Sequence, residues 1–336
     1  MKIMIAGLGS IGRRHLRNLL ACGENDILLY RTHLGSLPEE ELLRFPTETD
    51  LQAALSHRPD AVIISNPTAL HMDIAIPAAE AGCHLLLEKP VSHSLERLED
   101  LRTIAARTGS RILVGFQFRF HPGLRLIRQL LDNADQPQTG IGRIISVHAH
   151  WGEYLPNWHP WEDHRRGYAA RPDLGGGVIL TLCHPLDYLG WFLGRVTNIT
   201  AFTSSLGLNL LVEDTADIGL HFANGVVGSV HLDYVQRPSR HVLEMIGTRG
   251  TIRWDNADGA VGLSIAGKDG SPGKWQTFPA PVGFERNQMF LDQIRHFIRV
   301  CRGEIQPVCS LEDGIRALTL SLGALQSARE QVLVSL

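Results

Sequence analysis

The sequence predicts a two-domain α/β protein, with a parallel sheet in the first domain and a large, mostly antiparallel open sheet in an α+β second domain. Three observations predict this fold class. Short apolar runs alternate with helical patterns over the first third of the chain. A glycine-rich turn separates the first run from the first helix. Beyond residue 140, many strand-like runs are linked by short turns. The length of 336 residues suits two domains, predicted as 1–121 and 122–336.

The chain begins with an apolar strand that leads directly into a glycine-rich turn and then a helix. Gly7, Gly9 and Gly12 form the pattern GxGxxG at this junction. The first glycine permits a tight turn, the second lets a pyrophosphate approach the backbone, and the third lets the helix pack against the strand. Ser10 and Ile11 open the helix, whose N–H groups would face the phosphates. The pattern predicts an NAD(P)-binding Rossmann domain; an ordinary strand–turn–helix without ligand is the alternative.

Further strands of the first domain end at residues that carry chemistry. Helices are expected between these strands, at residues 51–57, 72–82 and 95–108, and the strands are expected at residues 27–30, 61–65, 84–87 and 111–116. Ligands of parallel sheets bind beyond the carboxyl ends of the strands. Asn66, Glu88 and Lys89 fall at these ends, so we expect them to serve the binding site.

The end of the second strand bears on the choice of cofactor. Rossmann domains that bind NAD usually carry an acid there for the ribose 2′-hydroxyl, whereas an arginine accommodates the 2′-phosphate of NADP. This strand ends with Tyr30, Arg31 and Thr32. Arg31 and Thr32 therefore favour NADP over NAD. The alternative is that Arg31 stacks on the adenine and discriminates little between the two.

The second domain is predicted from a change of pattern. Strands are expected at residues 144–151, 196–202, 215–222, 226–235, 241–246 and 250–254, several of them joined by tight turns. Two helices follow, at residues 284–303 and 311–333, and these last helices could pack back on the first domain.

An unusual segment rich in histidine and tryptophan opens this second domain. His148 and His150 would share one face of a strand, and His159 and Glu162 could lie near them. Their spacing matches no standard zinc pattern, so no metal is predicted. Aromatic rings that stack on a sugar, with polar groups for its hydroxyls, suit a carbohydrate site better. The alternative is that one or two of the tryptophans at 151, 158 and 161 belong to the core or to a subunit interface.

His184 is the best candidate for a general base. It follows three glycines at 175–177, which permit close approach of backbone to ligand. Pro185 is expected to be the first residue of a helix, which places His184 at the N-cap. The helix N-terminus disfavours an imidazolium, and a neutral ring can accept a hydroxyl proton. Asp187 either orients this ring or caps the helix, and the sequence leaves both open.

These motifs together resemble the glucose–fructose oxidoreductase/inositol dehydrogenase (Gfo/Idh/MocA) family. The resemblance rests on the glycine turn, on Asn66-Pro67 with His71, on Glu88-Lys89-Pro90, on Arg119-Phe-His121-Pro122, and on the glycines followed by His184 and Asp187. It spans roughly residues 2–195. It implies NAD(P)-dependent oxidation or reduction of a sugar, an inositol or a sugar nucleotide, and a homodimer or homotetramer built through the open sheet.

The resemblance also implies roles for individual residues. Lys89 and His184 are similar to the active-site lysine and the catalytic histidine of the family, and the predicted catalytic set is Lys89, His184 and Asp187. Cofactor contacts are implied for Asn66, Pro67, His71, Glu88 and Lys89, and substrate contacts for Lys89, Arg119, Trp161, Arg165 and His184. Many members carry an acid three or four residues before the histidine, where this chain has Leu180 and Thr181.

The sequence thus predicts hydride transfer between a nicotinamide and a carbinol carbon. A sensor that binds nucleotide or sugar without catalysis is one alternative, and a sugar-modifying enzyme that regenerates its cofactor within each cycle is another. Composition opposes other classes: 44% hydrophobic residues and a net charge of −3 give no field for nucleic acid or membrane. Five scattered cysteines and no recognisable targeting segment lead us to expect a cytoplasmic protein.

Overall fold

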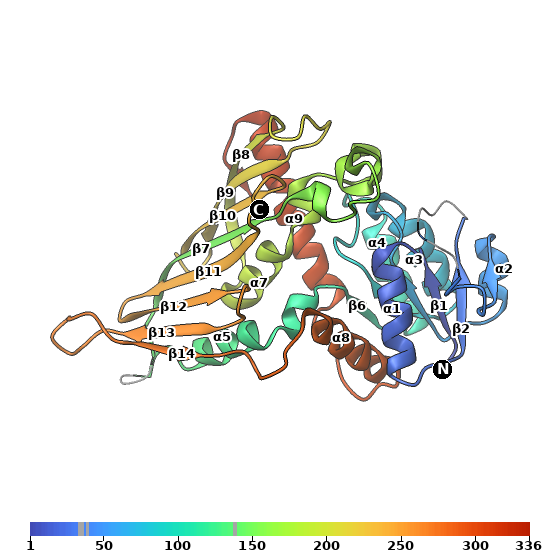
Figure 1. The fold of residues 1–336 in the computed structure, drawn as a ribbon, viewed down its shortest axis with the longest axis horizontal. Coiled ribbons are helices and arrows are strands. Elements are labelled where there is room, and N and C mark those ends of the chain that lie inside the picture. Colours follow the sequence, from blue (N-terminus) through green and yellow to red (C-terminus); the bar gives the residue numbers. More distant parts are fainter. Residues whose placement is uncertain (33–36, 38–39, 137–139) are drawn as a thin grey trace. The chain divides into compact units, whose positions relative to one another are not determined.

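The computed structural model describes residues 1–32, 37, 40–136 and 140–336 (Figure 1). The chain divides into two compact units. The first unit contains residues 1–117, 173–176 and 286–318, and the second contains 118–172, 177–285 and 319–336. The chain thus enters the second unit at Phe118, and residues 286–318 belong with the N-terminal part. No helix of the described residues is long and apolar enough to cross a membrane.

The first unit is built on a six-stranded parallel sheet in the order β3-β2-β1-β4-β5-β6. Its central strands are apolar and fully buried, as parallel sheets covered on both faces require. The strands are β1 Ile3–Ala6, β2 Ile27–Tyr30, β3 Thr47–Glu48, β4 Ala61–Ile64, β5 His84–Leu87 and β6 Ile112–Val114. The predicted strands are confirmed; the short β3 was missed.

Helices surround this sheet. They are α1 Ser10–Ala21, α2 Leu51–Ser56, α3 His71–Glu80, α4 Leu98–Thr108, α8 Arg286–Cys301 and the first part of α9 Leu311–Glu330. Helix α8 packs beside α1 (Figure 1), where Asn287 and Asn18 exchange side-chain hydrogen bonds of 3.0 and 3.4 Å. Helix α9 is capped at its start: the carboxylate of Asp313 accepts hydrogen bonds from the backbone N–H and hydroxyl of Ser310, both at 2.8 Å.

The second unit is built on a nine-stranded sheet in the order β14-β13-β12-β11-β7-β10-β9-β8-β15. Neighbouring strands are antiparallel except for β7 and β10, which pair in parallel. This confirms the predicted mostly antiparallel sheet. The strands are β7 Ile144–Gly152, β8 Val196–Ser204, β9 Thr215–Phe222, β10 Val227–Asp233, β11 Arg240–Gly247, β12 Gly250–Asp255, β13 Val261–Ile265, β14 Trp275–Phe278 and β15 Val334–Ser335.

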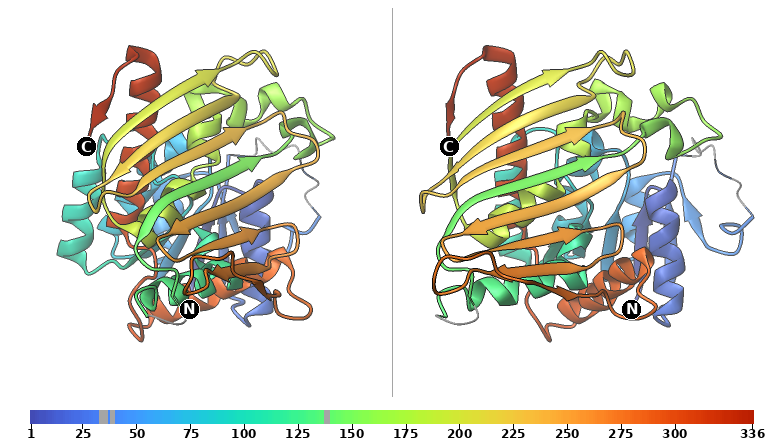
Figure 2. Two further views of the ribbon diagram at one scale, coloured as in Figure 1. Left: turned by 90° about the vertical axis from the view of Figure 1, so that its left-hand side faces the viewer. Right: turned by 60° about the vertical axis from the view of Figure 1, so that its left-hand side comes forward.

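One face of this sheet is covered by helices of the same unit. Helices α5 Pro122–Asp132, α6 Val178–Thr181 and α7 His184–Leu193 pack against it, and Figure 2 shows the strands in front of them. Residues on the strands alternate accordingly between buried and exposed positions. No described helix of this unit lies on the other face, which we call the open face. Helix α5 and strands β13, β14 and β15 were not predicted.

Candidate functional site

The glycine turn has the geometry that its sequence pattern predicts. Gly7 has a φ of +89°, and a Cβ there would lie 2.5 Å from the backbone nitrogen of Asn66. A Cβ on Gly12 would lie 1.9 Å from the carbonyl oxygen of Gly7, so only glycine lets the helix approach the strand this closely. At Gly9, by contrast, no atom of the described chain lies within 4 Å of the position of a Cβ. The exposed backbone of Gly9 is therefore open to a ligand.

Helix α1 presents its N-terminus at this turn. Gly9 is its N-cap and supplies no side-chain hydrogen bond, and the helical ladder begins with the N–H of Arg13, which donates to Gly9 at 3.0 Å. The N–H groups of Ser10, Ile11 and Gly12 precede that ladder and have no intrahelical acceptor. Such N–H groups at the positive end of a helix dipole bind phosphate. Together with the open backbone of Gly9, they fit the pyrophosphate of a dinucleotide.

The end of β2 offers a cation and a hydroxyl. The backbone N–H of Arg31 donates to the carbonyl of Glu48 at 3.1 Å, which holds the chain against β3. The Arg31 residue is half-buried and Thr32 is exposed. Neither residue supplies the carboxylate that NAD-specific sites usually place here.

A buried histidine, His71, holds the loop after β4 through contacts with backbone carbonyl oxygens. His71 is 1% exposed, and its Nε2 and Nδ1 lie 3.0 Å and 3.3 Å from the carbonyl oxygens of Asn66 and Val91. Burial lowers the pKa of His71, although these backbone contacts oppose the shift. His71 therefore fixes the backbone of the loop that contains Asn66 and Pro67. The buried Oδ1 of Asn66 has no hydrogen-bond partner among the described residues, an acceptor that a ligand would satisfy.

The end of β5 carries a buried carboxylate and a lysine. Glu88 is 8% exposed, and its Oε1 lies 2.8 Å from Nε2 of the fully buried His15 on α1. Burial raises the pKa of Glu88, but the hydrogen bond and charge of His15 and the charge of Lys89 outweigh it and lower the pKa overall. A Cβ on Gly115 would lie 2.9 Å from this carboxylate. Glu88 is thus held as an anion, and its Oε2 also accepts a hydrogen bond from the backbone N–H of the half-buried Lys89 at 3.3 Å.

His184 lies in the second unit among aromatic rings. It is 1% exposed, and its ring centroid lies 5.0 Å from that of Phe118 and 5.4 Å from that of Trp151. Trp151 in turn stacks on His241 at 4.4 Å. The prediction that His184 is the N-cap of α7 is wrong: the helix begins one residue earlier, so His184 is its first residue and Cys183 the cap. Proline is tolerated anywhere in the first turn of a helix, so Pro185 is compatible with either start of α7, and the sequence does not distinguish between them.

Asp187 forms a buried ion pair with Arg119. The guanidinium donates from Nη2 to Oδ1 at 2.7 Å and from Nε to Oδ2 at 3.0 Å, and the two side chains are 4% and 2% exposed. Arg119 also lies over the ring of Trp191, 5.6 Å from its centroid. The structure therefore gives Asp187 a partner that neither sequence-based alternative included.

The segment between β7 and α6 exposes two of the predicted substrate residues. Trp161 is 60% exposed, with its Nε1 donating to Glu162 at 3.1 Å, and Arg165 is also exposed. Trp151 is 4% exposed, so the core interpretation holds for this tryptophan. Trp158 is half-buried and packs edge-on against Tyr234 at 5.7 Å. Trp161 and Arg165 thus offer aromatic and cationic surface for a ligand, and Tyr168 of the same segment is also exposed, at 38%.

Sequence reasoning missed Glu213, which lies against Gly177, the last of the three glycines before His184. Its Oε1 accepts a hydrogen bond from the N–H of Ile179 at 3.0 Å, and a Cβ on Gly177 would lie 2.4 Å from the same oxygen. Burial raises the pKa of Glu213 to about 7. Gly177 therefore makes room for a side chain of the protein, whereas the sequence predicted room for a ligand. A Glu-Asp pair before a strand is normally exposed to solvent, so the sequence does not indicate that Glu213 is buried against Gly177.

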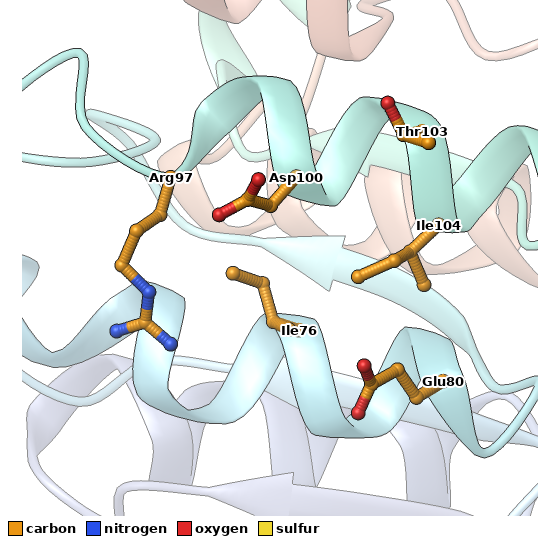
Figure 3. Close-up of a pocket in the computed structure, with 6 residues that line it drawn as sticks. All are labelled: Ile76, Glu80, Arg97, Asp100, Thr103 and Ile104. Atoms are coloured by element: carbon orange, nitrogen blue, oxygen red, sulfur yellow. The ribbon is translucent and has the colours of Figure 1, made fainter.

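The hollow drawn in Figure 3 lies between helices α3 and α4. It is lined by Ile76, Glu80, Arg97, Asp100, Thr103 and Ile104. These residues belong to the outer helices and not to the carboxyl ends of the strands, where parallel sheets bind ligands. The candidate cofactor site is therefore the glycine turn with the ends of β2, β4 and β5.

Two family models match the chain. One, described as the oxidoreductase family with an NAD-binding Rossmann fold, matches residues 1–116, and the other, the GFO/IDH/MocA C-terminal domain, matches residues 125–253. An uncharacterised oxidoreductase from Synechocystis is 31% identical over 57% of this chain and 53% of its own length, so the chain aligns with about half of that relative. The myo-inositol 2-dehydrogenase of Thermotoga maritima is 25% identical over 100% of this chain and 98% of its own.

The solved structures show the same fold. A levoglucosan dehydrogenase in complex with NADH and L-sorbose superposes with a TM-score of 0.86 and 19% identity, and covers 100% of this chain and 98% of its own. At this identity the likeness establishes the fold of both units. The family models add the class of protein, since they match both parts of the chain.

Proposed function

The chain belongs to the Gfo/Idh/MocA family of oxidoreductases with an NAD-binding Rossmann domain, and from this premise we propose that it transfers a hydride between a nicotinamide and a carbinol carbon of a sugar, an inositol or a sugar nucleotide. The observation that carries the proposal is the first unit's site. An open glycine backbone, a helix N-terminus and Lys89 all lie at the carboxyl ends of one parallel sheet.

The chain's own residues would bind the cofactor and move the proton. The nicotinamide, when bound, supplies the hydride acceptor or donor. Ser10, Ile11 and Gly12 would hold the pyrophosphate by their N–H groups. Lys89 polarises the reacting oxygen, and His184 takes the hydroxyl proton as the general base. The carboxylate of Glu88 accepts a hydrogen bond from the backbone N–H of Lys89 at 3.3 Å, which fixes the backbone from which the lysine side chain extends.

The cofactor site is tested by adding one methyl group. Gly9→Ala meets no atom of the described chain, so the variant should fold with an unchanged melting temperature. It should bind NAD(P) at least about tenfold more weakly, because the methyl group occupies the path of the pyrophosphate. Gly190→Ala on α7 is the control, since a Cβ there also meets nothing within 4 Å. Unchanged nucleotide affinity in Gly9→Ala would contradict the site.

The catalytic roles are tested by removing each proton-handling group. Lys89→Met and His184→Ala should each reduce turnover by roughly 10²–10⁴, the usual range for general acid–base residues. His184→Ala should still bind nucleotide normally, because the glycine turn holds the phosphates. The assay follows nicotinamide absorbance across a panel of sugars, inositols and sugar nucleotides. Full activity of His184→Ala would refute its role.

The same assay separates hydride transfer from a binding-only function. Thr181 is 2% exposed and carries a hydroxyl, so it does not supply the acid that many members carry near this position. If the panel gives no turnover while nucleotide still binds, the sensor interpretation is the better one. Mass spectrometry of protein purified without added nucleotide tests the third alternative, because a retained cofactor indicates recycling within each cycle.

NADP is the proposed preference within the family's NAD-binding class. Arg31 is a cation at the end of β2, with Thr32 beside it and no acid at these two positions. NADP should therefore bind several-fold more tightly than NAD, and Arg31→Ala should remove the difference. Titrations in which wild-type protein binds NAD as tightly as NADP would overturn this preference.

We also propose a homodimer or homotetramer that buries the open face of the nine-stranded sheet. Phe202, Val227 and Trp275 expose 77%, 50% and 44% of their surface there. Exposed apolar side chains on an uncovered sheet favour association between copies. Sedimentation at micromolar concentration should give at least twice the mass of one chain, and a mass of one chain would refute the assembly.

A further inference from the structure

Three potential metal-ligating side chains meet on the open face of the second unit. His150 lies on β7 and faces His231 directly across the parallel pair of strands, and Asp233 lies two residues farther along β10. One nitrogen of each histidine and one oxygen of Asp233 all lie within 4.8 Å of one another. The ring centroids of the two histidines are 4.6 Å apart. Ligand atoms around a tetrahedral zinc ion are separated by about 3.4 Å, given metal–ligand distances near 2.1 Å.

Neighbouring groups orient the side chains of His231 and Asp233 toward each other. Nδ1 of His231 lies 2.8 Å from Oδ1 of Asp217 on β9, which leaves Nε2 directed at Asp233 Oδ2, 3.3 Å away. A carboxylate behind the second nitrogen of a histidine is the usual support of a metal ligand. Oδ1 of Asp233 accepts the backbone N–H groups of Val235 and Gln236 at 2.8 and 2.6 Å, and its other oxygen is left to face His231.

A glycine makes room for the cluster, and an amide offers a fourth oxygen. The side-chain oxygen of Gln236 lies 2.5 Å from Nε2 of His150. A Cβ on Gly152 would lie 2.2 Å from both Oδ2 of Asp233 and Oε1 of Gln236. Any larger residue at this position would therefore displace the two oxygens. The convergence of two imidazoles and two oxygens depends on a particular backbone and is more than a chance gathering of surface histidines.

We propose that His150, His231 and Asp233 bind a divalent transition-metal ion of the zinc class, with Gln236 or water as a further ligand. A site with two imidazole nitrogens and one carboxylate oxygen favours zinc, cobalt or nickel. Calcium and magnesium instead prefer sites made of oxygen ligands alone. Asp233 and Asp217 balance the charge of the ion.

This site is distinct from the proposed catalytic residues of the same unit. Successive side chains of a strand point to opposite faces, so His150 and Trp151 lie on opposite sides of the sheet. The ring of Trp151 contacts His184 on the covered face. The metal would therefore join β7 to β10 from the open face. It would link the two strands near their ends. The backbone N–H groups of Glu153 and Leu155 donate there to the carbonyl oxygens of Asp233 and Tyr234.

The test is a zinc titration of the full-length chain without a polyhistidine tag. Protein is first treated with chelator, and zinc is then partitioned against a chromophoric chelator of known affinity. Wild-type protein should bind one zinc ion per chain at micromolar or lower concentration. His150→Ala and Asp233→Asn should each weaken that binding at least tenfold. Asp233→Asn keeps the oxygen that accepts the backbone N–H groups, which preserves the turn after β10.

A matched control distinguishes this site from general histidine binding. His148 lies on the same strand and the same open face, and its ring bonds Ser229 at 2.8 Å outside the cluster. His148→Ala should bind zinc like the wild type. Zinc should also raise the melting temperature of wild-type protein but not of Asp233→Asn. The proposal is overturned if wild-type chain binds zinc no better than His150→Ala, or if His148→Ala loses binding to the same extent.

Discussion

Replacing Asp187 by asparagine tests whether its ion pair with Arg119 is a buried structural interaction. The substitution keeps the shape of the side chain and removes the negative charge. The Arg119 guanidinium, whose side chain is 4% exposed, would then be buried without its counter-ion. Breaking one partner of a buried pair costs about 3–5 kcal/mol of unfolding free energy, whereas losing only a favourable charge in the first turn of a helix costs about 0.3–1 kcal/mol. The two interpretations therefore differ several-fold in magnitude.

The assay is urea unfolding at neutral pH, followed by tryptophan fluorescence. Asp187→Asn should lower the stability of the second unit by about 3–5 kcal/mol. The double variant Arg119→Met/Asp187→Leu should lose much less than the sum of the single variants, because no unpaired charge is left in the interior. A loss below about 1 kcal/mol in Asp187→Asn would refute the buried-pair reasoning and return the residue to the role of a helix cap.

The activity of the same variants separates positioning from folding. If Asp187 orients His184, Asp187→Asn should shift the acidic limb of the pH–rate profile, where a general base becomes protonated, and the shift should persist where the protein is fully folded. If Asp187 serves Arg119 alone, Arg119→Met and Asp187→Asn should reduce activity only in parallel with stability. An altered pH profile in Asp187→Asn alone would establish a link to the histidine.

Two further predictions concern stability. The pKa of Glu213 is about 7 in the folded protein against an ordinary value of 4.5. The folded state therefore holds the proton more tightly, and the associated stability is lost as pH rises from about 4.5 through 7, by at most about 3 kcal/mol. Glu213→Gln should thus stabilise the protein at pH 8 but not at pH 4.5 in urea unfolding; equal effects at both pH values would contradict the assignment. Gly12→Ala should lower both the melting temperature and nucleotide affinity, because its Cβ would lie 1.9 Å from the carbonyl oxygen of Gly7; a stable, nucleotide-binding variant would disprove the close helix–strand contact.

The sequence predicts the first unit well because its information is local. The strands of a parallel sheet covered on both faces are short apolar runs, and the glycine turn depends on residues five positions apart. The unpredicted α5 shows the limit. Leu124 and Ile127 form its buried stripe, and Pro122 lies in its first turn, but the helix directly follows the expected domain boundary, and no element was predicted there. Strands β13 and β14 were missed because glycine and polar residues interrupt their apolar pattern.

The site residues that the sequence missed are defined by contacts between distant positions. His15 reaches Glu88 across 73 residues, and Arg119 reaches Asp187 across 68. Periodicity identifies which face of an element is buried, but it does not identify which buried polar group will meet another. The position of His15 on the buried side of α1 was the one available indication, since a polar residue there requires a partner. Only the register of the folded sheet shows that this partner is Glu88.

The two halves of the proposed activity rest on different kinds of structure. The dinucleotide contacts proposed for the first unit would come from backbone N–H groups and from positions where only glycine fits, so they would depend little on side-chain identity. The sugar contacts proposed for Trp161 and Arg165 come from exposed side chains on short turns that follow β7. Loops of this kind change readily without altering the scaffold that carries them. Substitutions at Trp161 or Arg165 should therefore change which sugar is used and leave nucleotide binding intact. A loss of nucleotide affinity in Trp161→Ala would show that this separation of roles is wrong.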